Sequence, residues 1–279
     1  MKKQHKRNIN QYILNSFLII YTVIQIYPLF WLLLFSFKDN SEIYGGNVMG
    51  LPTHLLWQNY KNAIVNANIG LFFINSIIVT FGTIVISDIL ACMASFAITR
   101  MKWKLSKPVL ILFLLGMMIP LHASLLPLFI TLRSLKLIST YWALILPYVG
   151  FAQPMAIFIL SSFLESIPGE LEEAAIIDGA SIYRIFCLII LPLMKPAIAT
   201  ISIFTFLSAW NELMFGVTFI SKQSMKTLTV GILSLQGRYA IEWGPIGAGL
   251  VIATLPTLMI YILMSSQVQK SLTSGALKG

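Results

Sequence analysis

The acidic residues of this 279-residue chain are concentrated in one short segment. Five of the ten Asp and Glu residues fall within 14 positions: Glu165, Glu170, Glu172, Glu173 and Asp178. Acidic side chains complement the dipole in the first turn of a helix, while Pro168 suits the start of a short helix and Gly179 the position just past its end. The pattern predicts a short capped helix. Such a helix is either a solvated connector or a docking surface for another protein.

The residues that follow predict a second helix. Ser181 is expected to cap a helix that continues through Tyr183 and Arg184 to Ile189. Two prolines are expected to interrupt or bend it: Pro192 and Pro196. Three small side chains in the acidic segment would let another backbone approach closely: Ala174, Ala175 and Ala180.

Few other side chains could carry chemistry. Asp88 lies in an apolar stretch, about 18 Å along a helix from Arg100, where a charge is costly. It is expected either to form a structural hydrogen bond with a neighbouring helix or to lie near a solute path. His122 has no second ligand at metal-binding spacing, so no metal site is predicted. Cys92 and Cys187 lie in apolar runs and are expected to be small buried hydrophobes.

Composition indicates what kind of elements must position these residues. The chain is 57% hydrophobic and 10% charged, against about 25% charged in a soluble domain. Its 19 basic and 10 acidic side chains cannot cover a soluble particle of this size. The formal net charge of +9 is not arranged as a dense basic stripe with exposed aromatic residues, which argues against nucleic-acid binding. The composition predicts a membrane protein.

Six charge-poor windows are long enough for a helix to cross a bilayer, which needs about 20 residues. They are residues 9–37, about 69–99 with Asp88 inside, 108–132, 137–164, about 185–211 with Lys195 inside, and 243–269. The first is too long for the core of a signal peptide and is expected to be retained. The prolines of the third window, Pro120 and Pro127, are expected to bend it. The predicted fold is an all-α membrane protein with six transmembrane helices and a single membrane domain over residues 1–279.

The distribution of Lys and Arg predicts the orientation. Six spans place both termini on one side of the membrane. With the N-terminus in the cytoplasm, 12 Lys and Arg residues fall in cytoplasmic segments and seven in outer segments, which the positive-inside rule favours. The acidic segment between the fourth and fifth windows then lies in the cytoplasm. The longer outer segments are about 38–68 and 212–242.

The acidic segment also carries a family motif. Glu173-Ala-Ala-Ile-Ile-Asp-Gly-Ala-Ser181, followed by Ile189-Ile-Leu-Pro-Leu-Met-Lys-Pro196, resembles the EAA signature of permease subunits of bacterial ABC importers. Further similar segments extend over nearly the whole chain: 59–61, Asn75-Ser76, 97–100, 117–120, Trp210-Asn211-Glu212, 228–231, 243–244 and 272–279. They resemble the carbohydrate-uptake branch, in particular its maltose-permease G-type subunits. The resemblance implies the type I ABC importer fold, with a core domain at about 69–269 and a coupling helix within the loop 165–196.

The resemblance implies the partners and the docking residues. The partners would be a second homologous permease subunit, two cytoplasmic ATPase subunits, an extracytoplasmic solute-binding protein, a sugar substrate and the lipid bilayer. The ATPase-docking residues would be Glu172, Glu173, Ala174, Ala175, Asp178, Gly179 and Ala180. Among these, Glu173 would contact a basic residue of the ATPase, and Asp178 with Gly179 would fix the turn. The cytoplasmic tail, residues 270–279, would also reach the ATPase, although Ser271 and Leu277 depart from the family's glycine and valine.

ATP chemistry is expected to belong to a partner. The sequence has no G-x-x-x-x-G-K-[ST] loop, so no cofactor is expected here, and ATP and Mg would be bound by the ATPase subunits. Trp210, Asn211 and Glu212 could stack on and hydrogen-bond a sugar, or could anchor and end a helix at the membrane interface; with Asp88 they form the candidate solute path. The solute itself, whether a sugar, a polyol or a glycerol-phosphate-type compound, is not identified.

Two other classes of protein also fit this composition, a secondary transporter and a membrane-embedded enzyme. A secondary transporter needs ion-coupling acids inside the membrane, and a membrane-embedded enzyme needs convergent catalytic groups. The spans offer only Asp88 and His122 for either purpose. The sequence therefore favours a transport subunit over both.

Overall fold

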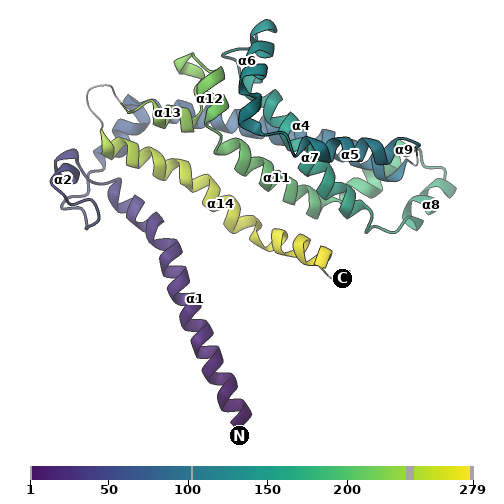
Figure 1. Ribbon diagram of the computed structural model, residues 1–279, viewed down its shortest axis with the longest axis horizontal. Helices are drawn as coiled ribbons and strands as arrows, with labels where there is room; N and C mark the ends of the chain where they lie inside the picture. The colour runs from purple at the N-terminus through teal and green to yellow at the C-terminus, as the bar shows by residue number, and fades with distance from the viewer. Residues whose placement is uncertain (1, 102, 237–241, 277–279) are drawn as a thin grey trace. The chain divides into compact units, whose positions relative to one another are not determined.

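The computed structural model describes the backbone of residues 2–101, 103–236 and 242–276, and the side chains of residues 11–101, 103–236 and 242–264. The regular elements that it describes are all helices (Figure 1). Contacts divide the chain into two units, one of residues 1–70 and 232–255 and the other of residues 71–231 and 256–279. Arg238, the side chains of the tail 270–279 and the departures at Ser271 and Leu277 lie outside the described residues.

The helices follow one another with short connections. They are α1 (Lys2–Phe35), α2 (Asn40–Tyr44), α3 (Gln58–Lys61), the π-helical η1 (Asn62–Asn66), α4 (Ile69–Arg100), α5 (Ser106–Gly116), the 3-10 turn η2 (Leu121–Ser124), α6 (Leu125–Ser134), α7 (Trp142–Leu164), α8 (Glu170–Ile177), α9 (Ile182–Arg184), the π-helical η3 (Ile185–Ile190), α10 (Leu191–Leu193), α11 (Lys195–Trp210), α12 (Met214–Phe219), the 3-10 turn η4 (Gln223–Met225), α13 (Leu228–Leu233) and α14 (Trp243–Ala276).

Four helices among the described residues are long and apolar enough to cross a membrane, and two bent pairs bring the number to six if each pair is one span. Four are single helices: Gln11–Phe35 within α1, α4, α7, and Trp243–Met264 within α14. Two are bent pairs, one of Ser106–Gly116 with Leu121–Ser134 at 91° and one of Ile182–Leu193 with Lys195–Trp210 at 73°. Counting each pair as one span confirms the predicted six-helix organisation.

The predicted bends fall at Pro120 and at Pro192 with Pro196, whereas Pro127 lies inside α6 and does not break it. Pro120 directly precedes η2, with extended backbone at φ −64° and ψ 120°, and the 91° bend lies in the break that it ends. Pro192 and Pro196 stand on either side of Met194, where the second pair breaks. A proline lacks the N–H of the helical ladder and clashes with the preceding turn, which explains why these spans do not continue straight.

The fourth span is shorter than predicted. The sequence window starts at residue 137, but α7 begins at Trp142. Lys136 and Ser139 both have a φ of 58°, and the Ser139 N–H donates to the Phe219 carbonyl at 2.9 Å. Residues 137–141 are therefore held in a turn. An apolar window cannot reveal this, because it registers hydropathy and not backbone conformation.

The first unit holds the segment after α1 by burying a lysine. Lys38 is 0% exposed, and its Nζ donates to the carbonyls of Asn47 at 2.5 Å and Val48 at 3.2 Å. Asn59 Nδ2 donates to the Lys38 carbonyl at 2.8 Å. At the start of α2, Asp39 accepts a hydrogen bond from the Glu42 N–H at 2.6 Å, and this bond with that of the Ser41 hydroxyl lowers the pKa of Asp39.

The second unit buries polar side chains near the start of α4. Asn75 Nδ2 donates to the carbonyls of Ser224 and Lys226, both at 2.9 Å, and the Tyr141 hydroxyl donates to Asn75 Oδ1 at 2.8 Å. Ser76 Oγ accepts from the Leu228 N–H at 2.8 Å. We call these residues the Asn75 network. Asn75 and Ser76 are 1% and 3% exposed, so the network joins three segments inside the unit.

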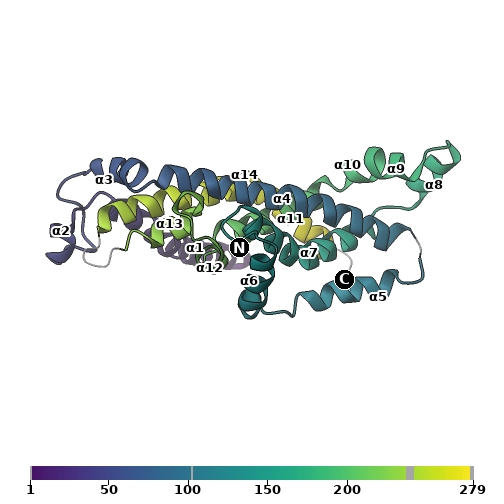
Figure 2. The same cartoon turned by 90° about the horizontal axis from the view of Figure 1, so that it is seen from above.

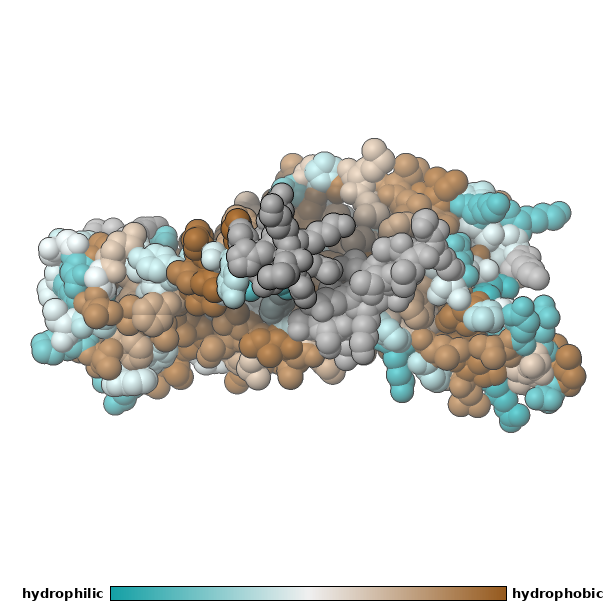
Figure 3. Space-filling view, turned by 90° about the horizontal axis from the view of Figure 1, so that it is seen from below, coloured by the Kyte–Doolittle hydropathy of each residue, from teal (hydrophilic) through white to brown (hydrophobic). Residues whose placement is uncertain are grey.

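The exterior is largely apolar along the helices. Figure 3 shows brown, hydrophobic side chains over much of the surface, with teal, hydrophilic ones at the right, where α8, α9 and the start of α5 lie, and others at the left. This is the surface expected of a protein whose solvent is lipid. Cys92 is buried as predicted, but Cys187, in η3, is exposed, so the prediction for Cys187 is wrong.

Candidate functional site

The acidic segment forms the predicted short helix, α8. Figures 1 and 2 place it with α9 at one end of the second unit, beyond the ends of α4 and α7. The Gly169 carbonyl accepts from the N–H groups of Glu172 at 3.0 Å and Glu173 at 3.2 Å. The helix begins at Glu170, two residues after Pro168, so the predicted proline start is slightly early.

The end of α8 is a Schellman turn. Gly179 has a φ of +78°, its N–H donates to the Ile176 carbonyl at 3.0 Å, and the Ala180 N–H donates to the Ala175 carbonyl at 2.9 Å. These are the two bonds of the motif, and only glycine adopts this backbone without strain. The prediction that Gly179 ends the helix is confirmed.

The following helix starts where predicted but without the predicted side-chain cap. Ser181 has extended backbone at φ −70° and ψ 158°, and its side chain makes no capping hydrogen bond. Its carbonyl accepts from the Ile185 N–H at 3.0 Å. Ser181 thus marks the boundary by its backbone conformation, and the expected hydroxyl cap is wrong.

The predicted docking residues lie on two faces of α8. Ala175 is 8% exposed and belongs to an apolar cluster with Leu164 and Ile185, and Ala180 packs against the same cluster. The other face is exposed and carries Glu173, Ala174, Ile176, Ile177 and Asp178, continuing to Gly179. Ile176 and Ile177 are 61% and 85% exposed. Two large apolar side chains exposed among charges are the partner-binding signal that the sequence motif alone did not single out.

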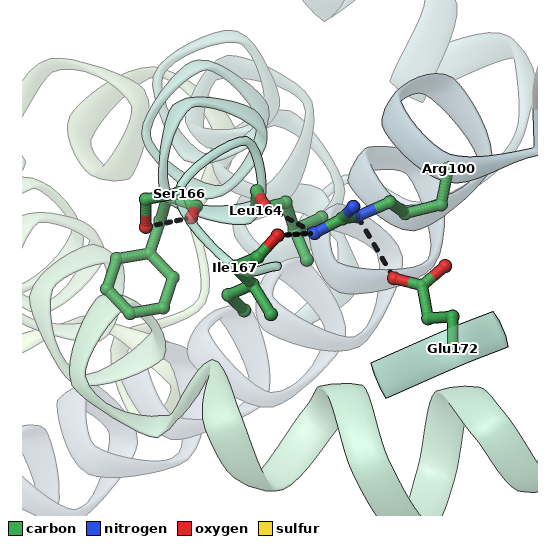
Figure 4. Close-up of polar contacts among 6 residues, drawn as sticks. Arg100, Leu164, Ser166, Ile167 and Glu172 are labelled. Carbon is green, nitrogen blue, oxygen red and sulfur yellow. Dashed lines mark hydrogen bonds and ion pairs between the residues drawn. The ribbon is translucent and has the colours of Figure 1, made fainter. Parts of the chain in front are cut away.

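Glu172 turns toward its own chain and not outward. Its Oε1 lies 3.1 Å from Arg100 Nε, in an ion pair whose two side chains are 14% and 15% exposed (Figure 4). Arg100 Nη2 also donates to the carbonyls of Leu164 at 2.6 Å and Ile167 at 2.7 Å. We call these contacts the Arg100 clamp. They join the last residue of α4, the end of α7 and the first turn of α8.

A cavity of about 290 Å³ lies within the second unit. Its lining comes from α4, η2, α7 and α11 and ends at Glu212: Thr83, Leu121, Tyr148, Phe151, Ala152, Met155, Ala156, Ile159, Ile201, Phe204, Thr205, Ser208, Ala209 and Glu212. Most of these side chains are apolar or aromatic, with a few hydroxyl groups and one carboxylate. This is the usual character of a site for a small polar molecule with apolar faces.

Glu212 is fixed at the edge of this cavity. Its Oε2 accepts from the Tyr148 hydroxyl at 2.6 Å, and its Oε1 accepts from the Phe215 N–H at 2.8 Å. The Gly216 N–H also donates to Oε2, at 3.2 Å. The carboxylate therefore caps the start of α12 and presents one edge to the cavity.

The other predicted solute-path residues do not line this cavity. Trp210 is 3% exposed, stacks on Phe206 with ring centres 5.5 Å apart and meets Phe73 edge-on at 5.6 Å. It ends α11 as expected, but it is a buried packing residue and not an interfacial anchor. Asn211 is exposed, and its Nδ2 donates back to the Leu207 carbonyl at 2.9 Å.

Asp88 makes the hydrogen bond that was one of its two predicted roles. Ser202 Oγ of α11 lies 2.5 Å from Asp88 Oδ2 and donates to it. The bond joins α4 to a helix more than 100 positions later in the chain. His122 lies exposed in η2, and the described residues hold no group of three or more His, Cys, Asp or Glu side chains that could bind a metal.

The fold defines the class of protein. A crystal structure of a bacterial ABC transporter involved in the import of alginate superposes with a TM-score of 0.82 at 20% identity, covering 93% of this chain and 96% of that one. The six apolar spans and the helix between the fourth and fifth spans therefore belong to the fold of an ABC importer permease.

Sequence comparison gives the family. Residues 89–273 match the family described as the binding-protein-dependent transport system inner membrane component. The ABC transporter permease protein ORF2 of Caldicellulosiruptor sp. (strain Rt8B.4) is 37% identical over 94% of this chain and 95% of its own length. The diacetylchitobiose uptake system permease protein NgcG of Streptomyces coelicolor is 34% identical over 95% of this chain and 88% of its own. The chain belongs to the binding-protein-dependent transport system inner membrane component family, which confirms the resemblance carried by the EAA segment.

Proposed function

We propose that this chain is one of two permease subunits of a sugar importer, and that it moves its solute by alternating access driven by ATP hydrolysis on separate subunits. Family membership supports the transport role and the dependence on a binding protein. The relative NgcG supports a sugar, since its name states diacetylchitobiose uptake. The proposed partners are a second permease, two ATPase subunits that bind ATP and Mg, and an extracytoplasmic solute-binding protein.

The observation that carries the proposal is the exposed face of α8. This helix is capped at its end, packed on one side by Ala175 and open on the other at Glu173, Ala174 and Ile177. Lipid does not require such a helix outside the spans, and an exposed pair of isoleucines is costly in water. Contact with an ATPase would cover the isoleucines and give Glu173 a basic partner.

The cavity is the proposed place for the solute. Sugars combine hydroxyl groups with apolar ring faces, and aromatic side chains bind those faces well. Phe151, Phe204 and Tyr148 line the cavity, with Glu212 and Ser208 as hydrogen-bonding groups. Of the four solute-path residues predicted from sequence, Glu212 is the one that this proposal retains at the solute. Asp88 is proposed to position α4 against α11 instead.

Both termini and α8 are proposed to lie in the cytoplasm. The excess of Lys and Arg on that side supports this orientation. Single cysteines at Glu170 and Thr218, introduced into a Cys92→Ala, Cys187→Ala chain, would test it in intact cells with a membrane-impermeant thiol reagent. Labelling at Thr218 and protection at Glu170 are expected. The reverse pattern would contradict the orientation.

The function is tested by reconstitution. The chain is purified with its neighbouring gene products, placed in vesicles with the binding protein, and assayed for uptake of labelled oligosaccharides with and without ATP inside. ATP-dependent uptake that needs the binding protein is expected. Uptake in vesicles without an ATPase subunit would overturn the proposal.

Docking through α8 has its own test. Glu173→Lys reverses the charge on the exposed face and is expected to reduce recovery of the ATPase with the permease, because like charges would then meet at the contact. Glu170→Lys, in the same turn but outside the EAA segment, is the matched control. Equal recovery of the ATPase with both variants would contradict a role for Glu173 in docking.

A further inference from the structure

We propose that Arg100 is a positioning residue that makes the ends of α4 and α7 move together with α8. The inference rests on the proposed function, because it concerns how a displacement of α8 by an ATPase would reach the spans. In this arrangement the movement passes directly to α4 through one side chain, as well as along the linkers on either side of α8.

The placement of Arg100 is the first part of the argument. It is the last residue of α4, where a cation is favoured by the helix dipole. From there its guanidinium reaches two carbonyls near the end of α7, those of Leu164 and Ile167, at 2.6 and 2.7 Å. The carbonyls at a helix end lack partners within the helix. Arg100 therefore adds donors from a different span at the end of α7, where the Leu164 carbonyl also accepts from the Ile167 N–H at 3.0 Å.

The third partner extends the contact to α8. Glu172 Oε1 lies 3.1 Å from Arg100 Nε, and both side chains are mostly shielded from water. An ion pair in that setting is screened less by salt than one on an open surface. Figure 4 shows the guanidinium between the carbonyls on one side and the Glu172 carboxylate on the other. One side chain thus links three elements.

The chemistry of the contact requires an arginine. A guanidinium has five N–H donors in a fixed plane, so it can serve two carbonyls and a carboxylate together. A lysine at this position keeps the charge but offers a single ammonium group, which cannot reach partners on both sides in the same geometry. Arg100→Lys is therefore expected to keep attraction to Glu172 and to lose the rigid connection.

The contacts of α8 explain why the link matters. Apart from Glu172, α8 packs on the unit through Ala175 and, just beyond its end, Ala180. Both side chains are single methyl groups, and the burial of apolar groups has no preferred direction. Glu173 and Asp178 are both exposed. The Arg100–Glu172 ion pair adds a charged contact between α8 and the two spans.

The experiment measures coupling and not only activity. The reconstituted complex carries Glu172→Gln, which preserves shape and removes charge, or Arg100→Lys, which preserves charge and removes the planar donors. Both are expected to copurify with the ATPase at the wild-type level and to lower the solute taken up per ATP hydrolysed by about fivefold or more. Glu170→Gln, an exposed acid in the same turn, is the control and is expected to leave this ratio unchanged.

The double variant tests whether the two residues act through one contact. If they do, Arg100→Lys with Glu172→Gln lowers the ratio no further than the stronger single variant. Hydrogen exchange in the peptide that covers residues 165–181 adds a structural readout, and its rate is expected to rise about fivefold in both single variants.

Three results would overturn the inference. These are an unchanged uptake per ATP in both single variants, additive losses in the double variant, or loss of the ATPase from the Glu172→Gln complex, which would assign Glu172 to docking. A wild-type complex that shows no ATP-dependent uptake contradicts the proposed function itself. The two failures are therefore distinguishable. The inference fails on a wild-type complex that couples uptake to ATP hydrolysis, whereas the proposed function fails when the wild-type complex shows no such coupling.

Discussion

At its Arg100 end, α4 is joined to its neighbours by a charged side chain, whereas near its start it is joined by the neutral Asn75 network. Both ends link α4 to two other segments, and both use a side chain to satisfy backbone carbonyls. Asn75 is 1% exposed, while the Arg100 and Glu172 side chains are 14% and 15% exposed. Buried neutral hydrogen bonds hold a fixed arrangement, while a partly exposed ion pair suits a place that must meet another protein.

The difference agrees with the proposed roles of the two ends. Asn75 and Ser76 hold the segment 224–228 and Tyr141 within the unit. Asn75 and Ser76, at the centre of this set, are buried, so neither can contact a partner. The Arg100 clamp instead holds a helix whose other face is open. Variants at each end of α4 test this difference.

The largest effect is expected for Arg100→Ala. The change leaves the Glu172 carboxylate without its cation and removes the Arg100 donors from the Leu164 and Ile167 carbonyls, of which Leu164 keeps the Ile167 N–H. The expected cost is about 3 kcal/mol in the free energy of unfolding. A lower melting temperature of the purified permease, measured by intrinsic fluorescence, checks it. Arg184→Ala removes an exposed arginine nearby and should have little effect. Equal shifts for the two variants would contradict the clamp.

Asn75→Ala is expected to cost about 2 kcal/mol, because it removes two donated and one accepted hydrogen bond inside the unit. The same melting measurement detects the loss. Tyr141→Phe removes only the bond to Asn75 Oδ1 and should cost about 1 kcal/mol. A larger loss from Tyr141→Phe than from Asn75→Ala would show that Asn75 is not the centre of the network.

Gly179→Ala is expected to cost about 1 kcal/mol, because an L side chain is strained at a φ of +78°. The change should raise hydrogen exchange in α8 and leave the Asn75 network unaffected. Gly150→Ala is a matched control, since the added methyl group meets no atom within 4 Å there. Unchanged exchange in α8 would mean that the turn after Asp178 does not need glycine.

The smallest expected effect is a difference in salt dependence between the stabilities of variants at the two ends of α4. Glu172→Gln should cost about 1 kcal/mol at low ionic strength and less at about 0.5 M NaCl, because salt screens a partly exposed pair. The cost of Asn75→Ala should be the same at both salt concentrations. Melting curves of both variants and the wild type in the two buffers measure this. A salt-independent cost at Glu172 would remove the distinction between the ends.

Part of the site could be predicted from local sequence. The acids of the first turn, Gly179 and the residues after it specify a short capped helix, because caps and turn residues act within a few positions. The bends at Pro120 and Pro192 follow from the missing N–H of proline in the same way. The EAA segment indicated the protein family. These features need no knowledge of distant contacts.

Other parts of the site depended on residues far apart in the chain. Glu172 was grouped with the docking residues, but it faces Arg100, 72 positions earlier. Trp210 looked like an interfacial anchor, but Phe73 and Phe206 cover it. No spacing rule predicts either pairing, because both depend on which helices lie next to each other.

The sequence by itself determined that lipid surrounds this protein, where its six spans run and that a capped helix separates the fourth from the fifth. Hydropathy, prolines and turn residues act locally, so a linear pattern records them. Only the tertiary structure decided which side chains meet: Asp88 with Ser202, Tyr148 with Glu212, and Arg100 with Glu172. Charge in the sequence marked where α8 would lie, and packing decided that one of its acids, Glu172, pairs with Arg100 while Glu173 and Ile177 stay exposed.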